Sequence, residues 1–267
     1  MRWMVGRAMQ LLSRIGNEAT RHVAYPNYSA AFRTCGDGYE NSDLATTIMY
    51  KTQRLEEIDA KTYTYEWLAP VVAAIAYLRA PGRPVRLLDF GGAFGAHRKA
   101  VISVFPDLAT RWAIIETPLF VKKGQEMAAD DLNWFEDVAH ASDWLGGIDL
   151  ALFSGVIQCV EDPAKLLEKA ISLNSPAILW QRTCLSFGAQ IITVQKSRLK
   201  DNGPPGPLPD GLMDRTVRYP KTYFPKDAFL RAHQGYDLRF HLKGDENIIA
   251  GQETEEGSAY FFVRRNQ

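Results

Sequence analysis

Residues 85–97 read Val-Arg-Leu-Leu-Asp-Phe-Gly-Gly-Ala-Phe-Gly-Ala-His, an apolar run that ends in an acid and passes directly into a glycine-rich turn. A buried parallel strand that leads through such a turn into a helix is typical of Rossmann-like folds, where the helix N-terminus faces a ligand. Glycines at the turn let the main chain approach that ligand without a Cβ atom. The segment therefore predicts an α/β fold with a ligand site after its first strand.

The spacing of the glycines distinguishes between two kinds of ligand. A dinucleotide fingerprint, G-x-G-x-x-G, that started at Gly91 would need glycines at the positions of Ala93 and Ala96. The pattern that fits is D-x-G-x-(G/A)-x-G, from Asp89 to Gly95. This is the form used for S-adenosyl-L-methionine (SAM), which we therefore predict as the cofactor.

Short apolar runs alternate with helical patterns through the middle of the chain. Strands that alternate with helices pair in parallel through right-handed crossovers. Two strand-like runs close the chain with no helical pattern between them, which indicates an antiparallel hairpin at the sheet edge. We predict a Rossmann-like class I methyltransferase sheet of seven strands, mostly parallel, with an antiparallel C-terminal hairpin and N-terminal helices. The expected strands are 85–90, 111–116, 132–136, 148–154, 176–182, 236–242 and 259–264, and the expected helices are 44–57, 65–80, 96–105, 118–128, 162–173 and 225–233.

Residues 201–211 hold four prolines and three glycines, a composition that excludes a helix or a central strand. Because this segment follows the fifth strand, we expect a loop near the carboxyl ends of the strands. Two interpretations stay open, a loop that covers the substrate and a surface loop with no role.

Two parts are expected along the chain, an N-terminal helical extension of residues 1–64 and a SAM-binding methyltransferase domain of residues 65–267. In residues 1–16, apolar residues recur at helical spacing and three arginines fall on the other side. Such a helix either docks on the domain or lies on an anionic membrane surface. Asn41-Ser42-Asp43 is predicted to cap the helix that follows it.

Composition excludes several classes of partner. Lys plus Arg and Asp plus Glu number 31 each, so the net charge is zero and we expect no nucleic-acid partner. The three cysteines lie far apart without metal-ligand spacing, which indicates a reducing compartment and no metal site. We expect a cytoplasmic protein, peripheral at the inner membrane if residues 1–16 bind lipid, with a small-molecule or glycan acceptor as its partner.

SAM carries an amine, a carboxylate, a ribose diol and an adenine, so its site needs acids in particular places. Asp89 is expected to hold the amine, and Glu116, 25 residues after Gly91, to accept both ribose hydroxyls. An acid after the third strand is expected at the adenine amino group. The predicted cofactor-binding residues are Asp89, Gly91, Gly92, Gly95, Glu116, Glu136, Asp137, Ser154 and Gln158.

Several blocks, taken together, resemble a family of bacterial class I SAM-dependent methyltransferases of unassigned substrate, often linked to surface-polysaccharide gene clusters. The blocks are 88–92, 116–121, 154–163, 182–183, 193–195 and 219–220, with weaker likeness at 38–39 and in the C-terminal strand. The resemblance covers about residues 35–265. It implies methyl transfer, with O-methylation of a glycan or a glycan precursor as the expected reaction.

Two residues are candidates for catalysis. Methyl transfer from a sulfonium is an in-line displacement that depends mainly on placing the nucleophile. A sugar hydroxyl would also need a general base, and His97, just past the glycine turn, is the candidate. Arg182, at the end of the fifth strand, is expected to hold an anionic or hydroxylated acceptor. Gln181 departs from the family, because an acid is expected at its position.

Two alternative functions stay open. A non-catalytic protein that keeps this fold within a glycan-assembly complex fits the lack of a clear base and the segment after Gly95, which is a few residues shorter than the resemblance leads us to expect. An NAD(P)-dependent oxidoreductase fits a similar sheet, although Ala93 and Ala96 argue against it.

Overall fold

The structure is a computed structural model that describes residues 23–36, 38–55 and 68–265. Its strands are β1 Val85–Phe90, β2 Thr110–Ile115, β3 Leu132–Phe135, β4 Leu150–Ser154, β5 Ala177–Ser186, β6 Ile191–Arg198, β7 Thr216–Pro225, β8 Tyr236–Leu242, β9 Asp245–Ile249 and β10 Gln252–Arg264. Its helices are α2 Tyr28–Phe32, α3 Ser42–Gln53, α4 Ala69–Leu78, α5 Ala96–Val104, α6 Pro118–Gly124, α7 Val138–Leu145, α8 Pro163–Ser172 and α9 Lys226–Ala232, with 3-10 turns η1 Gln125–Met127 and η2 Leu199–Asp201.

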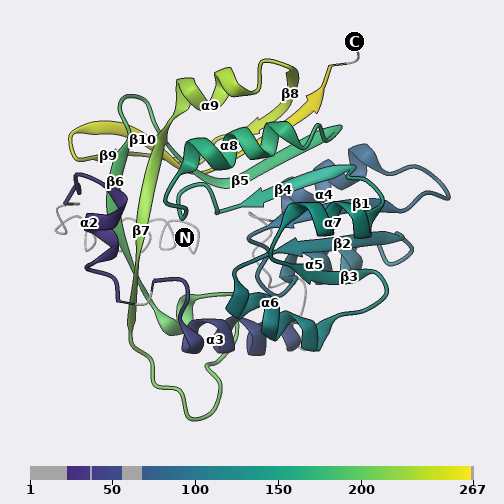
Figure 1. Cartoon of the computed structure of the whole chain (residues 1–267), viewed down its shortest axis with the longest axis horizontal. Helices are drawn as coiled ribbons and strands as arrows, with labels where there is room; N and C mark the ends of the chain where they lie inside the picture. Colours follow the sequence, from purple (N-terminus) through teal and green to yellow (C-terminus); the bar gives the residue numbers. More distant parts are fainter. Residues whose placement is uncertain (1–22, 37, 56–67, 266–267) are drawn as a thin grey trace, which may run out of the picture.

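One sheet forms the centre of the molecule, in the strand order β3-β2-β1-β4-β5-β10-β8 (Figure 1). The first five of these strands are parallel, whereas β10 runs antiparallel to both β5 and β8. This order and these directions confirm the predicted Rossmann-like class I methyltransferase sheet, including its antiparallel C-terminal strands.

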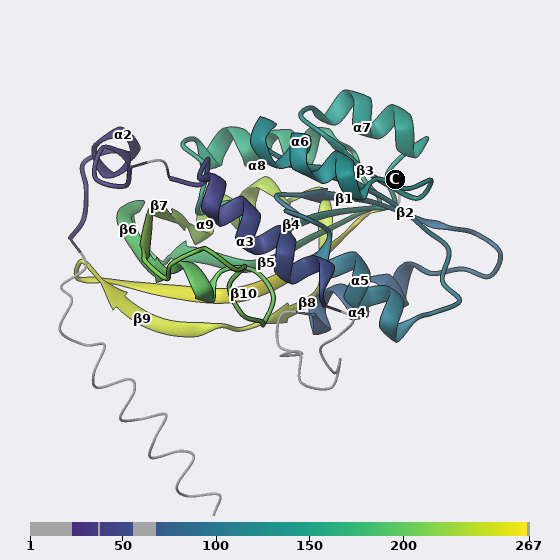
Figure 2. The same ribbon diagram turned by 90° about the horizontal axis from the view of Figure 1, so that it is seen from below.

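Helices cover both faces of the parallel strands, which explains why those strands are apolar on both sides. Helices α4 and α5 pack on one face around Trp112 and Leu150. Helices α8 and α9 pack on the other face around Trp180, and α7 packs there beside Leu88. Figure 2 shows α7 and α8 above the sheet and α4 and α5 below it. Because β1, β2, β4 and β5 are parallel neighbours, their carboxyl ends lie together on the same side of the sheet.

Helix α3 begins where the sequence predicts, because the side chain of Asn41 accepts a hydrogen bond from the backbone N–H of Leu44 at 3.0 Å. Its buried residues Ala45 and Met49 pack against Phe94 of the glycine turn and Phe120 of α6. The N-terminal part of the chain therefore helps to hold the glycine turn in place.

The described residues form three strands, β6, β7 and β9, in addition to the seven that we predicted. Strands β6 and β7 form an antiparallel hairpin, and the end of β7 pairs in parallel with the end of β5. Strand β9 pairs with β10. Strand β5 is also longer than expected, since it continues to Ser186, and helix α7 fills a stretch for which we predicted no element.

The proline-rich segment 201–211 does not leave β5 directly, as we expected, but connects η2 to β7 at the far end of the β6–β7 hairpin. Helix α3 fixes its start, because Lys51 Nζ donates hydrogen bonds to the carbonyl oxygens of Lys200 and Asn202. The expectation that this segment leaves β5 directly was therefore wrong, because β6 comes between them (Figure 1). Its position near the strand ends stays a prediction.

Two expectations lie outside the described residues. The helix over residues 1–16 is one, and the domain boundary at residue 64 is the other. Helix α2 contacts β6 and β7, so part of the expected extension packs on the domain. Within the described ranges, no helix is both long enough and apolar enough to cross a membrane.

Candidate functional site

Asp89 forms the floor of the predicted site. Its side chain is fully buried at the end of β1, where Oδ2 accepts a hydrogen bond from Trp112 Nε1 at 3.1 Å. The other oxygen, Oδ1, is buried and has no hydrogen-bond partner among the described residues. Burial of a carboxylate oxygen without a donor is costly, so this atom is suited to a cationic or hydrogen-bonding group of a ligand.

The glycine turn lies directly over this carboxylate. A Cβ atom on Gly92 would lie 2.5 Å from the Cγ atom of Asp89, so no other residue fits there without a shift. Gly91 and Gly95 have φ angles of 72° and 80°, in the left-handed region that favours glycine. Gly95 also precedes α5, whose N-terminus has no side-chain cap.

Glu116 follows β2 and reaches back to the same turn. Its Oε1 accepts from the N–H of Ala93 at 2.9 Å, and its Oε2 accepts from the N–H of Thr117 at 3.0 Å. Burial raises the pKa of Glu116 to about 7, with smaller contributions from Asp89 and Glu40. The structure thus brings two predicted carboxylates, from the ends of β1 and β2, to opposite sides of one turn.

His97 joins three strand ends beneath the turn. Its Nδ1 lies 3.4 Å from Asp89 Oδ2, and its Nε2 lies 3.4 Å from Ser154 Oγ and 3.2 Å from Gln181 Nε2. Gln181 Nε2 also donates to Ser154 Oγ at 3.0 Å. Because an amide NH₂ group only donates, Nε2 of His97 accepts and the ring proton lies on Nδ1, toward Asp89.

His97 is buried, whereas a general base must be accessible to the acceptor. The residue is 7% exposed, and both ring nitrogens lie near protein groups. A role as a general base stays a prediction, and the geometry adds a second role, a link between β1, β4 and β5.

The predicted acids after β3 differ in their surroundings. Asp137 caps helix α7, where Oδ1 accepts from the N–H of His140 at 2.9 Å and Oδ2 contacts the His140 ring. Glu136 is exposed. Both adenine roles stay predictions, although the hydrogen bonds of Asp137 are already used by its helix.

Arg182 lies within β5, and Gln158 follows the end of β4 beside it. Gln158 Nε2 donates to the backbone carbonyl of Arg182 at 2.9 Å. Arg182 has a φ angle of 53°, a left-handed conformation that costs an arginine on the order of 1 kcal/mol. The proposed binding roles of both residues stay predictions.

Sequence reasoning missed three contributors to the site. Trp112, on β2, donates a hydrogen bond to Asp89. Gln181, on β5, contacts His97 and Ser154. Tyr39, in the segment before α3, contacts Cys159 after β4. A tryptophan inside an apolar strand and a glutamine where an acid was expected gave no positive signal. Tyr39 lay in a block of weak resemblance and was not assigned a role.

The cysteines near the site are not activated nucleophiles. Burial raises the pKa of Cys159 and that of Cys184 to about 11 each, so both are protonated thiols at neutral pH. Cys159 Sγ lies 2.8 Å from the hydroxyl of Tyr39. Within the described part of the chain, no group of three or more His, Cys, Asp or Glu side chains has the geometry to hold a metal ion.

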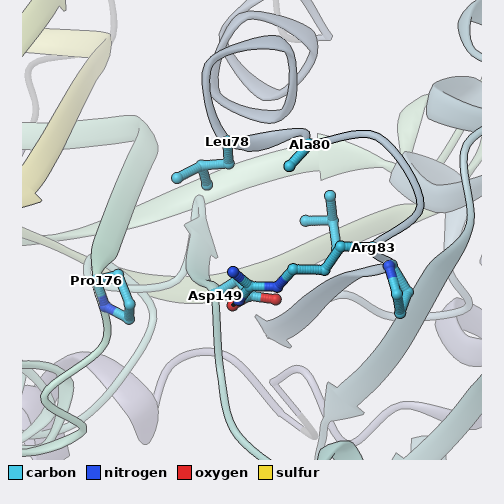
Figure 3. Close-up of a pocket in the computed structure, with 7 residues that line it drawn as sticks. Leu78, Ala80, Arg83, Asp149 and Pro176 are labelled. Carbon is cyan, nitrogen blue, oxygen red and sulfur yellow. Dashed lines mark hydrogen bonds and ion pairs between the residues drawn. The ribbon is translucent and has the colours of Figure 1, made fainter.

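A small cavity lies at the opposite edge of the sheet, beside the start of β1 (Figure 3). Arg83 and Asp149 form an ion pair at its wall, and Arg86 Nη2 lies 2.9 Å from the same carboxylate. The cavity volume of about 130 Å³ is below the roughly 300–1,000 Å³ of typical ligand pockets. This cavity is therefore too small for a nucleoside cofactor.

Comparison with known protein families finds no family that matches this sequence, and comparison with curated proteins finds no match. The fold is similar to that of solved methyltransferases at low sequence identity. Human N-acetylserotonin methyltransferase in complex with SAM shares 15% identity at a TM-score of 0.47, over 85% of this chain, which spans only 58% of that chain. The sugar N-methyltransferase KedS8 from Streptoalloteichus shares 17% identity over 80% of this chain and 91% of that chain, at a TM-score of 0.45. Burkholderia thailandensis 1,6-didemethyltoxoflavin-N1-methyltransferase, with bound S-adenosylhomocysteine, shares 15% identity over 94% and 98% of the two chains, at a TM-score of 0.43.

Proposed function

We propose that this chain is a SAM-dependent methyltransferase that transfers a methyl group to a hydroxyl of a glycan or a glycan precursor. The observation that carries the proposal is the buried carboxylate of Asp89 under Gly92, with one oxygen atom that no described residue satisfies. A cationic amine placed over the glycine turn would supply the donor that this oxygen lacks.

The donor side of the site matches the other groups of SAM. The uncapped N-terminus of α5 offers N–H groups to a carboxylate. Glu116 would exchange its hydrogen bond with Ala93 for the two hydroxyls of a ribose. Glu136 is the acid after β3 that we assign to the adenine amino group, because both oxygens of Asp137 already contact His140.

When bound, SAM supplies an electrophilic methyl group on a sulfonium. The chain itself contributes placement, because an in-line displacement needs the acceptor oxygen about 3–3.5 Å from the methyl carbon. The network of Asp89, His97 and Gln181 fixes the strand ends that carry the donor site. The acceptor then approaches from the side of β5 and β7, where Arg182 lies.

The choice of a glycan hydroxyl rests on the resemblance in the sequence and on the aromatic residues of that side. Tyr39 and Tyr219 stack with ring centroids 4.3 Å apart. Aromatic rings that flank a polar site are suited to the apolar face of a sugar ring.

Isothermal titration with SAM and with S-adenosylhomocysteine tests the donor half of the proposal. We expect a dissociation constant in the micromolar range and at least a tenfold loss of affinity for Asp89→Ala and for Glu116→Ala. Glu126→Ala, at an exposed acid on η1 that is not among the predicted site residues, serves as the matched control. Binding of NADH without any binding of SAM would reject the proposal.

Incubation with radiolabelled SAM and glycan fractions of the source cells tests the acceptor half. We expect label in a glycan fraction, with the label lost in Asp89→Ala. Tight SAM binding with no transfer to any fraction would instead favour the non-catalytic alternative.

A further inference from the structure

Arg182 stands out on β5 because every other residue of this ten-residue strand is buried. Opposite β10, the register shifts so that Gln181 and Arg182 together face the single residue Ala259. Such a bulge re-aims a side chain that regular alternation would direct elsewhere. With its φ angle of 53°, Arg182 is the point at which the strand turns a cation outward.

Two neighbours fix where the guanidinium lies. Gln158 Nε2 holds the Arg182 carbonyl, and Gly155 lies beneath the side chain. A Cβ atom on Gly155 would lie 3.6 Å from Cζ of Arg182, so the guanidinium rests on the turn that follows β4. That turn begins at Ser154, which belongs to the network under the glycine turn. Arg182 therefore lies next to the donor side of the site.

The opposite neighbours of Arg182 are aromatic. Burial raises the pKa of the hydroxyls of Tyr39 and Tyr219, and the positive charge of Arg182 opposes this shift in both. The guanidinium is thus close to the stacked pair of rings. Lys221, two residues beyond Tyr219 and on the same face of β7, adds a second cation, which Glu256 partly neutralises at 2.8 Å.

Charges of opposite sign are separated across the site. The carboxylates of Asp89 and Glu116 both lie against the glycine turn, and burial, together with the charges of Asp89 and Glu40, raises the pKa of Glu116. The cations Arg182 and Lys221 lie on the side of β5 and β7. A carboxylate-lined half suits a cationic donor, and an arginine beside it suits a partner that carries negative charge.

We propose that Arg182 binds an anionic group of the methyl acceptor, a carboxylate or a phosphate, while the partly exposed ring of Tyr39, which stacks on the buried Tyr219, contacts its apolar surface. The guanidinium fork matches both groups because each presents two oxygens for parallel hydrogen bonds. This inference rests on the proposed function and narrows the acceptor from any glycan to an acidic one, such as a uronic acid or a phosphorylated sugar.

Ligand-observed NMR titration of the full chain tests this inference with three probes: glucose, glucuronate and glucose 6-phosphate. Each titration is run with and without saturating S-adenosylhomocysteine. We expect at least one acidic probe to bind at least tenfold more tightly than glucose, and the two acidic probes separate carboxylate from phosphate recognition. In Arg182→Gln this preference should disappear, whereas S-adenosylhomocysteine affinity should stay within twofold of wild type.

Arg218→Gln is the matched control, because Arg218 is an exposed arginine on β7 adjacent to Tyr219 and therefore on the other face of that strand. It should keep the preference for acidic probes. Equal binding of glucose and both acidic probes, or a preference that survives Arg182→Gln, would overturn the inference. If the wild type does not bind S-adenosylhomocysteine, the proposed function is rejected. The affinities of the three probes can still be compared in that case, so the two failures are distinguishable.

Discussion

The amide nitrogen of Gln181 lies 3.2 Å from Nε2 of His97, and this contact connects the fifth strand to the helix that follows the glycine turn. An acid at position 181 would have faced the same ring nitrogen as an acceptor. The glutamine instead donates, so Nε2 of His97 accepts and Nδ1, 3.4 Å from Asp89 Oδ2, carries the ring proton. One amide therefore sets the hydrogen-bond direction of the whole buried network.

Gln181→Glu should reverse that direction. The new carboxylate can only accept, so a hydrogen bond to it requires a proton on Nε2 of His97. Nitrogen-15 NMR of the histidine rings should show Nε2 of His97 without a proton in the wild type and with one in the variant. The exposed His140 provides an internal control whose signals should not change. A wild-type ring protonated at Nε2 would contradict the assigned network.

Gly92→Ala should damage the site through a steric clash. The added methyl group would lie 2.5 Å from the Asp89 carboxyl carbon, and overpacking of this kind costs about 1–3 kcal/mol. We expect a lower free energy of unfolding in urea denaturation and at least a tenfold weaker affinity for S-adenosylhomocysteine. Gly235→Ala, where no atom lies within 4 Å of the added Cβ, should change neither quantity. Wild-type affinity in Gly92→Ala would remove this turn from the binding site.

Glu116 should make cofactor binding depend on pH. Its pKa of about 7 means that the carboxyl is increasingly protonated below neutrality, whereas two ribose hydroxyls need the ionised form as an acceptor. The dissociation constant of S-adenosylhomocysteine should therefore rise as the pH falls below about 7, approaching about tenfold per pH unit. Titration calorimetry from pH 5.5 to 8.5 measures this slope. Glu116→Gln should bind more weakly and without the slope, while Glu136→Gln should keep it; an identical slope in Glu116→Gln would assign the proton to another group.

Lys51 should hold the proline-rich segment against helix α3. Lys51 is only 2% exposed, and its ammonium group donates hydrogen bonds to two backbone carbonyls near the start of that segment. Lys51→Met leaves those carbonyls without their donor, at a cost of about 1–3 kcal/mol. Limited proteolysis should then cleave within residues 201–211 faster than in the wild type. Lys122→Met, at an exposed lysine on α6, is the control, and unchanged cleavage in Lys51→Met would show that the segment is fixed by other contacts.

The parallel half of the fold could be predicted because its strands are short, apolar and separated by helices. Asp89 and Glu116 carry the strongest signals, since each follows an apolar run where a parallel strand must end. The β6–β7 hairpin could not be predicted in the same way, because Pro220 and Pro225 in β7 argue against a central strand. Strand β7 accepts them because it lies outside the parallel core and pairs mainly with β6.

The candidate site was predictable residue by residue but not as a network. Sequence order places Ser154 and Gln181 27 residues apart, and only the parallel pairing of β4 with β5 brings them to the same register. The outward position of Arg182 depends on the bulge against β10, which forms from the far end of the chain. Pairing between strands that are far apart in the sequence cannot be predicted from the local residue pattern.

The two ends of the β6–β7 hairpin are fixed at one place, since β7 returns to pair with Leu185 and Ser186 where the chain left β5. Between these anchor points the hairpin also packs on helix α3, where Val217, Tyr219 and the turn η2 surround Leu44. Under the proposed function, this hairpin is the natural place for exchange experiments that alter acceptor choice, provided that its contacts with α3 are kept.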